Sequence, residues 1–311
     1  MKKMTNSSIF FALTLLAILF LNSCDQNKSD RPMTQEEKDY KYARIYIDEG
    51  IYDLMIKPCE VFDSIDYNAE LTIKSTSAWD CMKQLLTGYA EGVIVAMGQT
   101  HYWDSVMKRY NIKPLVQMTI ARDALTFYVR FNSPLDSLTD EQIYELLMNK
   151  NKSIRDYFPR LKNEFLFATN SPLSSEAVNL KQLVLKGKQA KRRIYYLPNH
   201  DSVKSLVKSN DVIGIGYLSQ IIHDPDLRPL RISFIDSSGK YIFPHAVHQA
   251  NIVRKLYPYI VTHYIYVISK KKEAAMRLGR YISKHGNAQR YFLKAGIVPA
   301  FAKIKLIDEV N

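Results

Sequence analysis

The sequence predicts an α/β fold built as two lobes with a cleft between them. Short apolar runs alternate with amphipathic stretches of about ten residues, which is typical of β-α-β units and a parallel sheet. A length of 311 residues suits two compact units at roughly 100–200 residues each. Two sets of this alternation follow one another, and the chain returns to the first set near Tyr241. That return indicates two lobes sharing a cleft rather than two separate domains.

The first set of elements lies between residues 43 and 97. We expect strands at Ala43–Ile47, 69–75 and 92–97, with helices at Ile51–Phe62 and 76–88 between them. The second helix closes at Gly88, a residue type common just past a helix end. The order strand, helix, strand, helix, strand predicts a parallel arrangement for this part of the sheet.

The second set extends from residue 123 to residue 219. We expect strands at 123–131, 163–169, 191–198 and 211–219, and helices at 138–150, 176–187 and Val203–Lys208. Thr139 with Gln142 three residues later forms a capping box, which satisfies free N–H groups at a helix start. A strand at 262–269 and a helix at Lys272–His285 then return to the first lobe. We therefore expect lobe 1 at about residues 41–120 and 240–311, and lobe 2 at about residues 121–239.

The N-terminus carries the features of an export signal. A basic start with Lys2 and Lys3 precedes thirteen residues, Ile9–Leu21, of which only Thr14 is polar. This apolar run fits a signal peptide, whereas a helix that spans a bilayer needs roughly 20 residues. The following letters, LNSC, resemble the lipobox of bacterial lipoproteins. We expect residues 1–23 to be removed and Cys24 to be lipidated; the alternative is a plain signal peptide with an incidental Cys24.

The predicted export places the chain in the cell envelope, either in the periplasm or exposed at the surface. This location determines how the net charge of the chain is interpreted. The chain holds 43 Lys and Arg against 31 Asp and Glu, a net charge of +12, and removal of residues 1–23 lowers that charge by two. A basic balance favours anionic partners, and nucleic acid is an improbable partner outside the cytoplasm. Residues 24–40 are polar without apolar periodicity and are predicted to tether the lipid to a domain at 41–311.

Two further cysteines remain once Cys24 is assigned to the lipid. Cys59 and Cys81 could form a disulfide in an oxidising compartment. However, Cys59 falls on one helical face with Met55 and Phe62, so two buried free thiols are the favoured interpretation. Neither cysteine has the surroundings of a catalytic thiol.

No motif in the chain predicts an enzyme. Gly214 and Gly216 follow a strand, as in a dinucleotide fingerprint, but Ser219 stands at the third glycine position. His245 and His248 lack the further ligands that a zinc site needs. No serine, histidine and aspartate are ordered so as to single out a nucleophile. We therefore expect no catalytic residues, no metal and no cofactor.

Four segments resemble a known family in its own order. They are ARDALTFYVRFNSPLDSLTDEQIYELL, DVIGIGYLS, KLYPYIVTHYIYVISK and HGNAQRYFLKAGIVPA. Together they resemble the phosphate-binding proteins of ABC importers, the PstS-like branch of the type 2 periplasmic binding proteins, over about residues 42–300. The resemblance implies a two-lobed α/β fold that holds a small anion in the cleft.

The resemblance also implies a set of anion-binding loops, each at the start of a helix. A helix start offers unpaired N–H donors and a partial positive charge, and hydroxyl groups and an arginine strengthen the binding of an anion. In this sequence the corresponding residues are Glu49, Gly50, Ile51, Ser75, Thr76, Ser77, Gly98, Gln99, Asn170, Ser171, Ser174 and Ser175.

The last of these loops departs from the family pattern. The family has an arginine near the position of Asn170 or Ser171, and Ser-Gly-Thr where this chain has Ser174, Ser175 and Glu176. The loop is therefore either an altered anion site or only a helix cap. Arg122, in the hinge segment, is a candidate to replace the missing charge.

Two functions follow from the resemblance. The first is a lipid-anchored, monomeric solute-binding protein that delivers phosphate or another small anion to an ABC permease, with lobe closure as the mechanism. The alternative is a degenerate relative that keeps the fold and acts as an envelope interaction or sensor protein without binding phosphate. The first function is the preferred interpretation of the sequence, and the absent arginine is the feature that favours the alternative.

Overall fold

The computed structural model describes residues 32–301. The chain divides into a first unit, Met1–Lys38, and a second unit, Asp39–Asn311. Helix α2 (Gln35–Lys41) begins in the first unit, where Thr34 and Glu37 exchange hydrogen bonds of 2.7 and 3.2 Å between backbone N–H groups and side chains. The end of the predicted tether is thus helical, and the capping pair at Thr34 and Glu37 is the signal that was missed. The predicted signal peptide and Cys24 lie outside the described residues.

The second unit is built on one large mixed sheet. Its strands are β1 (Tyr42–Asp48), β2 (Glu70–Thr76), β3 (Gly92–Val95), β4 (Val116–Arg130), β6 (Leu166–Asn170), β7 (Ile194–Leu197), β8 (Val212–Tyr217), β9 (Leu227–Pro229), β12 (Ile260–Val267) and β13 (Val298–Pro299). The main path has the order β2-β1-β3-β12-β4-β8-β6-β7, and β9 and β13 also pair with β4. A smaller sheet contains β5 (Ser137–Thr139), β10 (Arg231–Ile235) and β11 (Tyr241–His245).

Strand β4 joins two lobes. Its first part, from Val116 to Ala124, is antiparallel to β12. From Leu125 onward it pairs instead with β8 and then with β9. We refer to the part with β1, β2, β3 and β12 as lobe 1, and to the part with β6, β7 and β8 as lobe 2. The lobe limits expected from the sequence remain a prediction.

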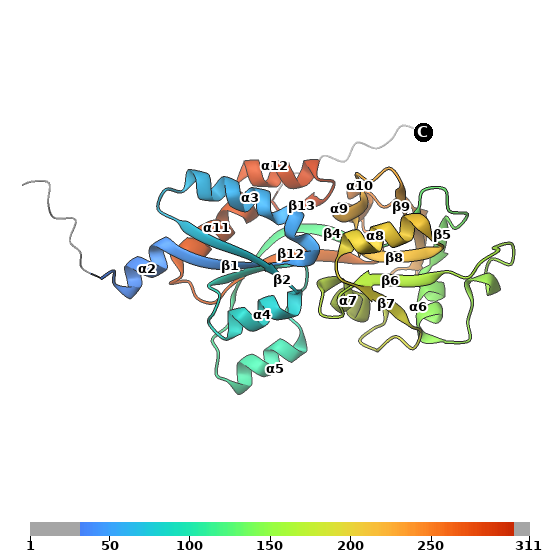
Figure 1. Cartoon of the computed structure of the whole chain (residues 1–311), viewed down its shortest axis with the longest axis horizontal. Coiled ribbons are helices and arrows are strands. Elements are labelled where there is room, and N and C mark those ends of the chain that lie inside the picture. Colours follow the sequence, from blue (N-terminus) through green and yellow to red (C-terminus); the bar gives the residue numbers. More distant parts are fainter. Residues whose placement is uncertain (1–31, 302–311) are drawn as a thin grey trace, which may run out of the picture. The chain divides into compact units, whose positions relative to one another are not determined.

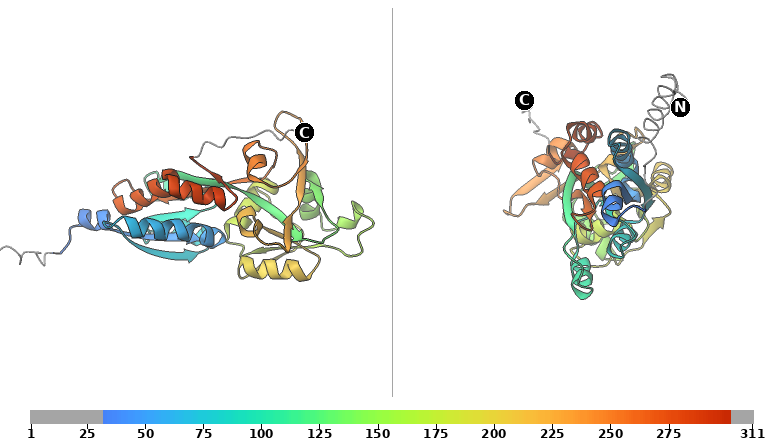
Figure 2. Two further views of the ribbon diagram at one scale, coloured as in Figure 1. Left: turned by 90° about the horizontal axis from the view of Figure 1, so that it is seen from above. Right: turned by 90° about the vertical axis from the view of Figure 1, so that its left-hand side faces the viewer.

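Helices cover both faces of the sheet (Figures 1 and 2). They are α3 (Tyr52–Ile65), α4 (Ala78–Leu86), α5 (His101–Arg109), α6 (Asp140–Met148), α7 (Ser175–Asn179), α8 (His200–Ser209), α9 (Leu218–Ile221), α10 (Gln249–Val253), α11 (Glu273–Lys284) and α12 (Gly286–Lys294). Two short 3-10 helices, η1 (Glu49–Ile51) and η2 (Ile154–Asp156), and a π-helix that continues α7, η3 (Leu180–Val184), complete the set. In lobe 1, α3, α11 and α12 lie on one face, and α4 and α5 lie on the other (Figure 1). Parallel strands with helices on both faces need apolar residues along their whole length, and β3 and β8 are buried throughout.

The predicted α/β fold is confirmed, with differences in particular elements. The capping box of Thr139 and Gln142 opens α6, with hydrogen bonds of 2.9 and 3.0 Å. The strand expected at 123–131 begins earlier, at Val116, because its first part crosses lobe 1 beside β12. Helices α5 and α12 were not predicted, since their sequences are strongly polar on one side.

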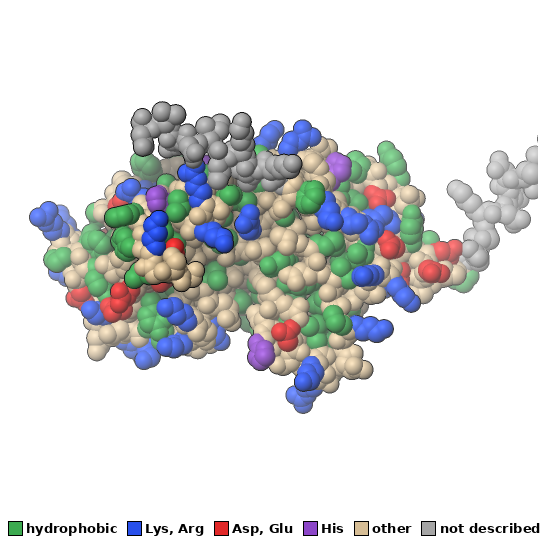
Figure 3. Space-filling view, turned by 180° about the vertical axis from the view of Figure 1, so that it is seen from behind, with side chains coloured by type: hydrophobic (Ala, Val, Ile, Leu, Met, Phe, Trp, Pro, Cys, Tyr) green, Lys and Arg blue, Asp and Glu red, His purple; other side chains and the backbone are tan. Residues whose placement is uncertain are grey.

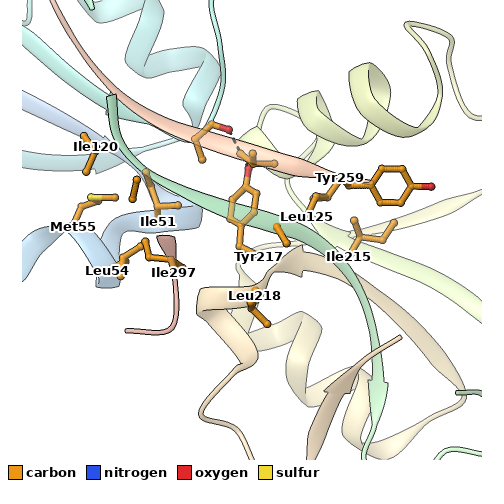
Figure 4. Packing of buried hydrophobic residues seen from close by; sticks show 14 of the residues in the cluster. Ile51, Leu54, Met55, Ile120, Leu125, Ile215, Tyr217, Leu218, Tyr259 and Ile297 are labelled. Carbon is orange, nitrogen blue, oxygen red and sulfur yellow. Dashed lines mark hydrogen bonds between the residues drawn. The ribbon is translucent and has the colours of Figure 1, made fainter. Parts of the chain in front are cut away.

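The main hydrophobic core continues from one lobe into the other. Figure 4 shows Tyr217 of lobe 2 between two groups of buried side chains, Ile51, Leu54 and Met55 on one side and Leu125, Ile215 and Tyr259 on the other. Burial of apolar surface contributes about 25 cal/mol per Å², so this shared core stabilises the contact between the lobes. Cys59 and Cys81 are both buried free thiols, as favoured from the sequence.

Within residues 32–301, no helix is long and apolar enough to cross a membrane.

Candidate functional site

Strand ends and helix starts converge where the two lobes meet. Strand β1 ends at Asp48 directly before η1, strand β3 ends just before Ala96, and strand β6 ends at Asn170 ahead of α7. The carboxyl ends of these strands open onto the same junction, which is where open α/β sheets bind their ligands. The residues at this junction form a network of buried polar side chains, which we call the interlobe network.

Asp48 anchors the lobe 1 side of the interlobe network. Its side chain is fully buried and accepts hydrogen bonds from the backbone N–H groups of Gly50 at 3.1 Å and Ala96 at 3.3 Å. Burial, together with the nearby charge of Glu176, raises the pKa of Asp48 to about 7, although hydrogen bonds from Ser175 and the two backbone groups oppose this shift. Asp48 therefore changes protonation near neutral pH.

Glu176 occupies the centre of the interlobe network. Only 1% of this residue is exposed. Its Oε1 accepts hydrogen bonds from Gln220 Nε2 at 2.8 Å and Asn170 Nδ2 at 3.3 Å, and its Oε2 accepts one from Ser175 Oγ at 3.4 Å. Both oxygens also approach Gly50 across the junction, because a Cβ atom added to Gly50 would lie 2.6 and 2.7 Å from them.

Four further hydrogen bonds cross between the lobes at this place. Gln220 Nε2 donates to Gly50 O at 2.7 Å, and Asn179 Nδ2 donates to Ala96 O at 2.6 Å. The hydroxyl of Tyr217 donates to Ala96 O at 3.4 Å, and within lobe 2 it accepts from Asn179 at 2.9 Å. The backbone N–H of Trp79 donates to Leu173 O at 3.2 Å. Buried polar groups that are paired across the lobes favour the closed arrangement over an open one.

The predicted serine loop before α7 serves as a helix cap. Ser174 is the N-cap residue, and its buried Oγ accepts a hydrogen bond from Ala177 N at 3.3 Å. Ser171 Oγ accepts from Leu173 N at 3.2 Å. Ser175 and Asn170 instead contact Glu176. The hydroxyl and amide groups of this loop are thus engaged with the chain itself.

The other predicted site residues lie at different distances from the interlobe network. Gly50 is part of it, and Ile51 is buried in the core behind it. Glu49 is half-buried, and burial with the charges of Glu176 and Asp80 raises its pKa. Ser77 caps α4 and accepts from Asp80 N at 3.2 Å.

The remaining predicted positions lie outside the network. Ser75 and Gly98 are exposed, and Thr76 is half-buried at the end of β2. Gln99 is exposed and donates to Asp104. Among the described residues, no hydrogen bond or ion pair joins Arg122, the candidate replacement for the missing arginine, to the interlobe network.

Three members of the interlobe network were not identified from the sequence. Gln220, Asn179 and Tyr217 supply the cross-lobe hydrogen bonds from side chains, yet Asn179 and Tyr217 were assigned only to a helix and a strand, and Gln220 to no element. Gln220 carried a signal, because its Oε1 accepts from Tyr217 N at 2.8 Å in a capping arrangement three residues apart. A capping glutamine at the end of a strand is therefore a sequence signal for a residue of the site.

A small cavity adjoins the interlobe network. It measures about 230 Å³ and is lined by Gly50, Ile51, Asp53, Leu54, His200, Lys204, Ser219 and Gln220. His200 Nε2 lies 3.4 Å from Asp53 Oδ2 across the junction. Gly50 and Gln220 belong both to the cavity wall and to the network, so the cavity lies next to the groups that contact Glu176.

A second buried pair of ionisable groups lies in the hinge strands. His263 and Asp123 are both fully buried, with 3.8 Å between Nε2 and Oδ2. Burial lowers the pKa of His263 to about 3 and raises the pKa of Asp123 to about 6. No group of three or more His, Cys, Asp or Glu side chains suited to a metal ion occurs between residues 32 and 301.

Comparison with solved structures identifies the fold. A putative phosphate ABC transporter substrate-binding protein from Clostridium perfringens, solved with bound phosphate, is similar at a TM-score of 0.68 and 15% identity, covering 83% of this chain and 99% of that one. An ABC-type phosphate transport receptor from Vibrio cholerae has a TM-score of 0.63 at 14% identity, covering 82% of this chain and 98% of that one.

The same fold also occurs in a regulator. The regulatory domain of a LysR family regulator from Neisseria meningitidis has a TM-score of 0.53 at 12% identity, covering 83% of this chain and 98% of that one. No family model matches the sequence, and no curated protein matches it. The chain therefore has the two-lobed fold of type 2 periplasmic binding proteins, and proteins of this fold include both transport receptors and regulatory domains.

Proposed function

We propose that this chain is a binding-protein-fold component of the cell envelope that acts as an interaction or sensor protein and not as a receptor for free phosphate. In this proposal Cys24 carries the lipid that anchors the chain to a membrane, and the chain is a monomer. The sequence features that support the anchor are the basic start, the apolar run Ile9–Leu21 and the lipobox-like LNSC.

One observation carries the proposal. The junction of the lobes holds two buried carboxyl groups, those of Asp48 and Glu176, which are close enough to raise the pKa of Asp48. A phosphate ion placed at this junction would meet like charge in a region shielded from water, where such repulsion is strong. No arginine or lysine is hydrogen-bonded to the network within the described residues, and Lys204 in the wall of the adjoining cavity already pairs with Asp201 at 2.7 Å, so a phosphate at Glu176 would have no unpaired cation beside it.

A second candidate is the small-anion receptor of an ABC importer. It is supported by the similarity to the Clostridium perfringens protein, whose structure holds phosphate, and by the hydroxyl and amide donors of Ser175 and Asn170. Under this candidate an ABC permease is the partner, and an incoming anion displaces the carboxylate of Glu176 from those donors.

Thermal unfolding of the full chain separates the two candidates. The melting temperature is measured in chloride and at matched ionic strength in millimolar phosphate, sulfate and a panel of small anions. We expect no shift specific to phosphate. A ligand at 100 times its Kd adds about 2.7 kcal/mol to the unfolding free energy, so a rise of several degrees in phosphate alone would overturn the proposal in favour of the receptor.

A further inference from the structure

We propose that the carboxylate of Glu176 is a resident anion: it occupies the interlobe site as an external ligand would, and it holds the two lobes closed. This inference rests on the proposed function, because a site filled by the chain's own carboxylate is unavailable to phosphate. It goes further in assigning Glu176 a positive role, and it predicts which small molecules replace that side chain when it is removed.

The hydrogen bonds of Glu176 are those of a bound ligand. Three side chains from different elements converge on its two oxygens: Asn170 at the end of β6, Ser175 in α7 and Gln220 in α9. In every one of these bonds Glu176 is the acceptor. A carboxylate has only acceptor sites when ionised, so this set of donors matches an anion.

Gln220 connects this carboxylate to lobe 1. Gln220 Nε2 lies 2.8 Å from Glu176 Oε1 and 2.7 Å from Gly50 O, which joins lobe 2 to the η1 turn of lobe 1. Because Gly50 has no side chain, its Cα can lie directly against the carboxylate oxygens. An anion in contact with both lobes is what stabilises the closed state in a hinge-type closure.

Removal of the side chain beyond Cβ would leave Asn170 Nδ2 without its acceptor, whereas Gln220 would still donate to Gly50 O and Ser175 would keep its hydrogen bond to Asp48. Glu176→Ala exposes Asn170 Nδ2 and Ser175 Oγ to a space the size of a small carboxylate, next to the cavity lined by Gly50 and Gln220. Formate and acetate carry the same acceptor group. They should enter this space and restore the missing contacts, whereas chloride at the same ionic strength should not.

The experiment compares Glu176→Ala with a matched control in the full chain. Glu141 holds the same second position of helix α6, also behind a side-chain N-cap, but it is exposed. We expect Glu176→Ala to lower the melting temperature by several degrees at pH 6, and tens of millimolar formate to recover much of that loss. Glu141→Ala should change the melting temperature by a degree or less and should not respond to formate.

Glu176→Gln gives a test that creates no cavity. The variant keeps the side-chain volume but replaces one acceptor oxygen by an NH2 donor among the donors of Asn170, Ser175 and Gln220, so at pH 6 we expect a melting temperature below that of the wild type and no response to formate. A Glu176→Gln chain as stable as the wild type would overturn the inference, and so would a Glu176→Ala chain that formate does not rescue. Neither result would affect the proposed function, which fails instead if phosphate stabilises the wild-type chain.

Discussion

The interlobe network and a basic groove on lobe 2 differ in the sign and the exposure of their charged side chains. The network buries two carboxyl groups, Asp48 and Glu176, among neutral donors. The groove, of about 810 Å³, is open and is lined by Lys150, Asn151, Lys152, Ser153, Glu164, Ala190, Lys191, Arg192 and Arg193. The chain thus places acids at the buried junction of the lobes, and cations where solvent reaches them.

Glu164, the one acidic residue that lines the groove, already has hydrogen-bond partners. Glu164 accepts a hydrogen bond from Arg192 Nη1 at 2.9 Å and another from Ser153 Oγ. Burial alone would raise the pKa of Glu164, but these hydrogen bonds and the charge of Arg192 lower it. Lys150 and Lys191 are exposed around this pair.

The difference shows that the net charge of +12 does not identify the binding site. Lys and Arg side chains are spread over both lobes on the face shown in Figure 3. Salt screens exposed charges over about 10 Å at ordinary ionic strength, whereas a buried carboxyl group keeps its influence on its neighbours. Substitutions should therefore have large effects in the network and small effects in the groove.

The largest effect is expected for Gly50→Ala. Its Cβ would lie 2.6 Å from a carboxylate oxygen of Glu176, so the lobes would have to move apart or the network rearrange, at a cost of about 3 kcal/mol. Gly98→Ala is the matched control, since the nearest atom to its Cβ lies 4.0 Å away. Urea unfolding measures both variants. Equal losses of unfolding free energy would show that the contact between Gly50 and Glu176 is unimportant.

The second largest effect is expected at Asp48, whose ionisation makes the unfolding free energy depend on pH. Its pKa of about 7 in the folded chain exceeds the unfolded value of about 3.9, so its contribution to stability is present below about pH 4 and is lost as the pH rises through 7. Asp48→Asn removes this loss. The unfolding free energy of the variant relative to wild type should rise by on the order of 2 kcal/mol between pH 4 and pH 8.

The control for Asp48→Asn is Glu60→Gln, at a side chain that is 57% exposed. Its stability relative to wild type should stay nearly constant over the same pH range. A flat difference for Asp48→Asn as well would mean that Asp48 is not buried next to another acid.

A smaller effect is expected for Tyr217→Phe. Loss of the hydroxyl removes an acceptor from Asn179 and a donor from Ala96 O, both of which are buried. An unpaired buried polar group costs roughly 1–2 kcal/mol. Tyr89→Phe, at a residue that is 64% exposed, should cost almost nothing. Chemical denaturation of the two variants would reveal whether the hydroxyl contributes to the contact between the lobes.

The smallest effect is expected in the basic groove. Lys191→Gln removes an exposed charge, and surface substitutions of this kind usually change stability by less than about 0.5 kcal/mol. A loss above about 1 kcal/mol in urea unfolding would show that the groove, like the network, depends on its charged groups for stability.

Much of the fold could be predicted because its signals are local. Alternating strands and helices, and the capping box of Thr139 and Gln142, depend on residues close in the sequence. Strand β4 was predicted too short because its first part is recognised only beside β12, more than a hundred residues away. Helix α5 was missed because few of its residues are buried.

The candidate site was less predictable because its contacts join residues that are far apart in the sequence. The acid at Glu176 and the missing arginine were visible in the sequence. The sequence could not show that Gln220, which is 44 residues away, donates to Glu176, or that Gly50 faces it from the other lobe. Those contacts join residues that are far apart in the sequence, and no local pattern encodes them.

A crystal structure of the wild-type chain grown at saturating phosphate would show what occupies the junction of the lobes. We predict that the Glu176 carboxylate remains hydrogen-bonded to Gln220 Nε2 and Asn170 Nδ2, with no phosphate at that junction. A phosphate ion bound to those donors, with Glu176 turned away, would contradict this prediction.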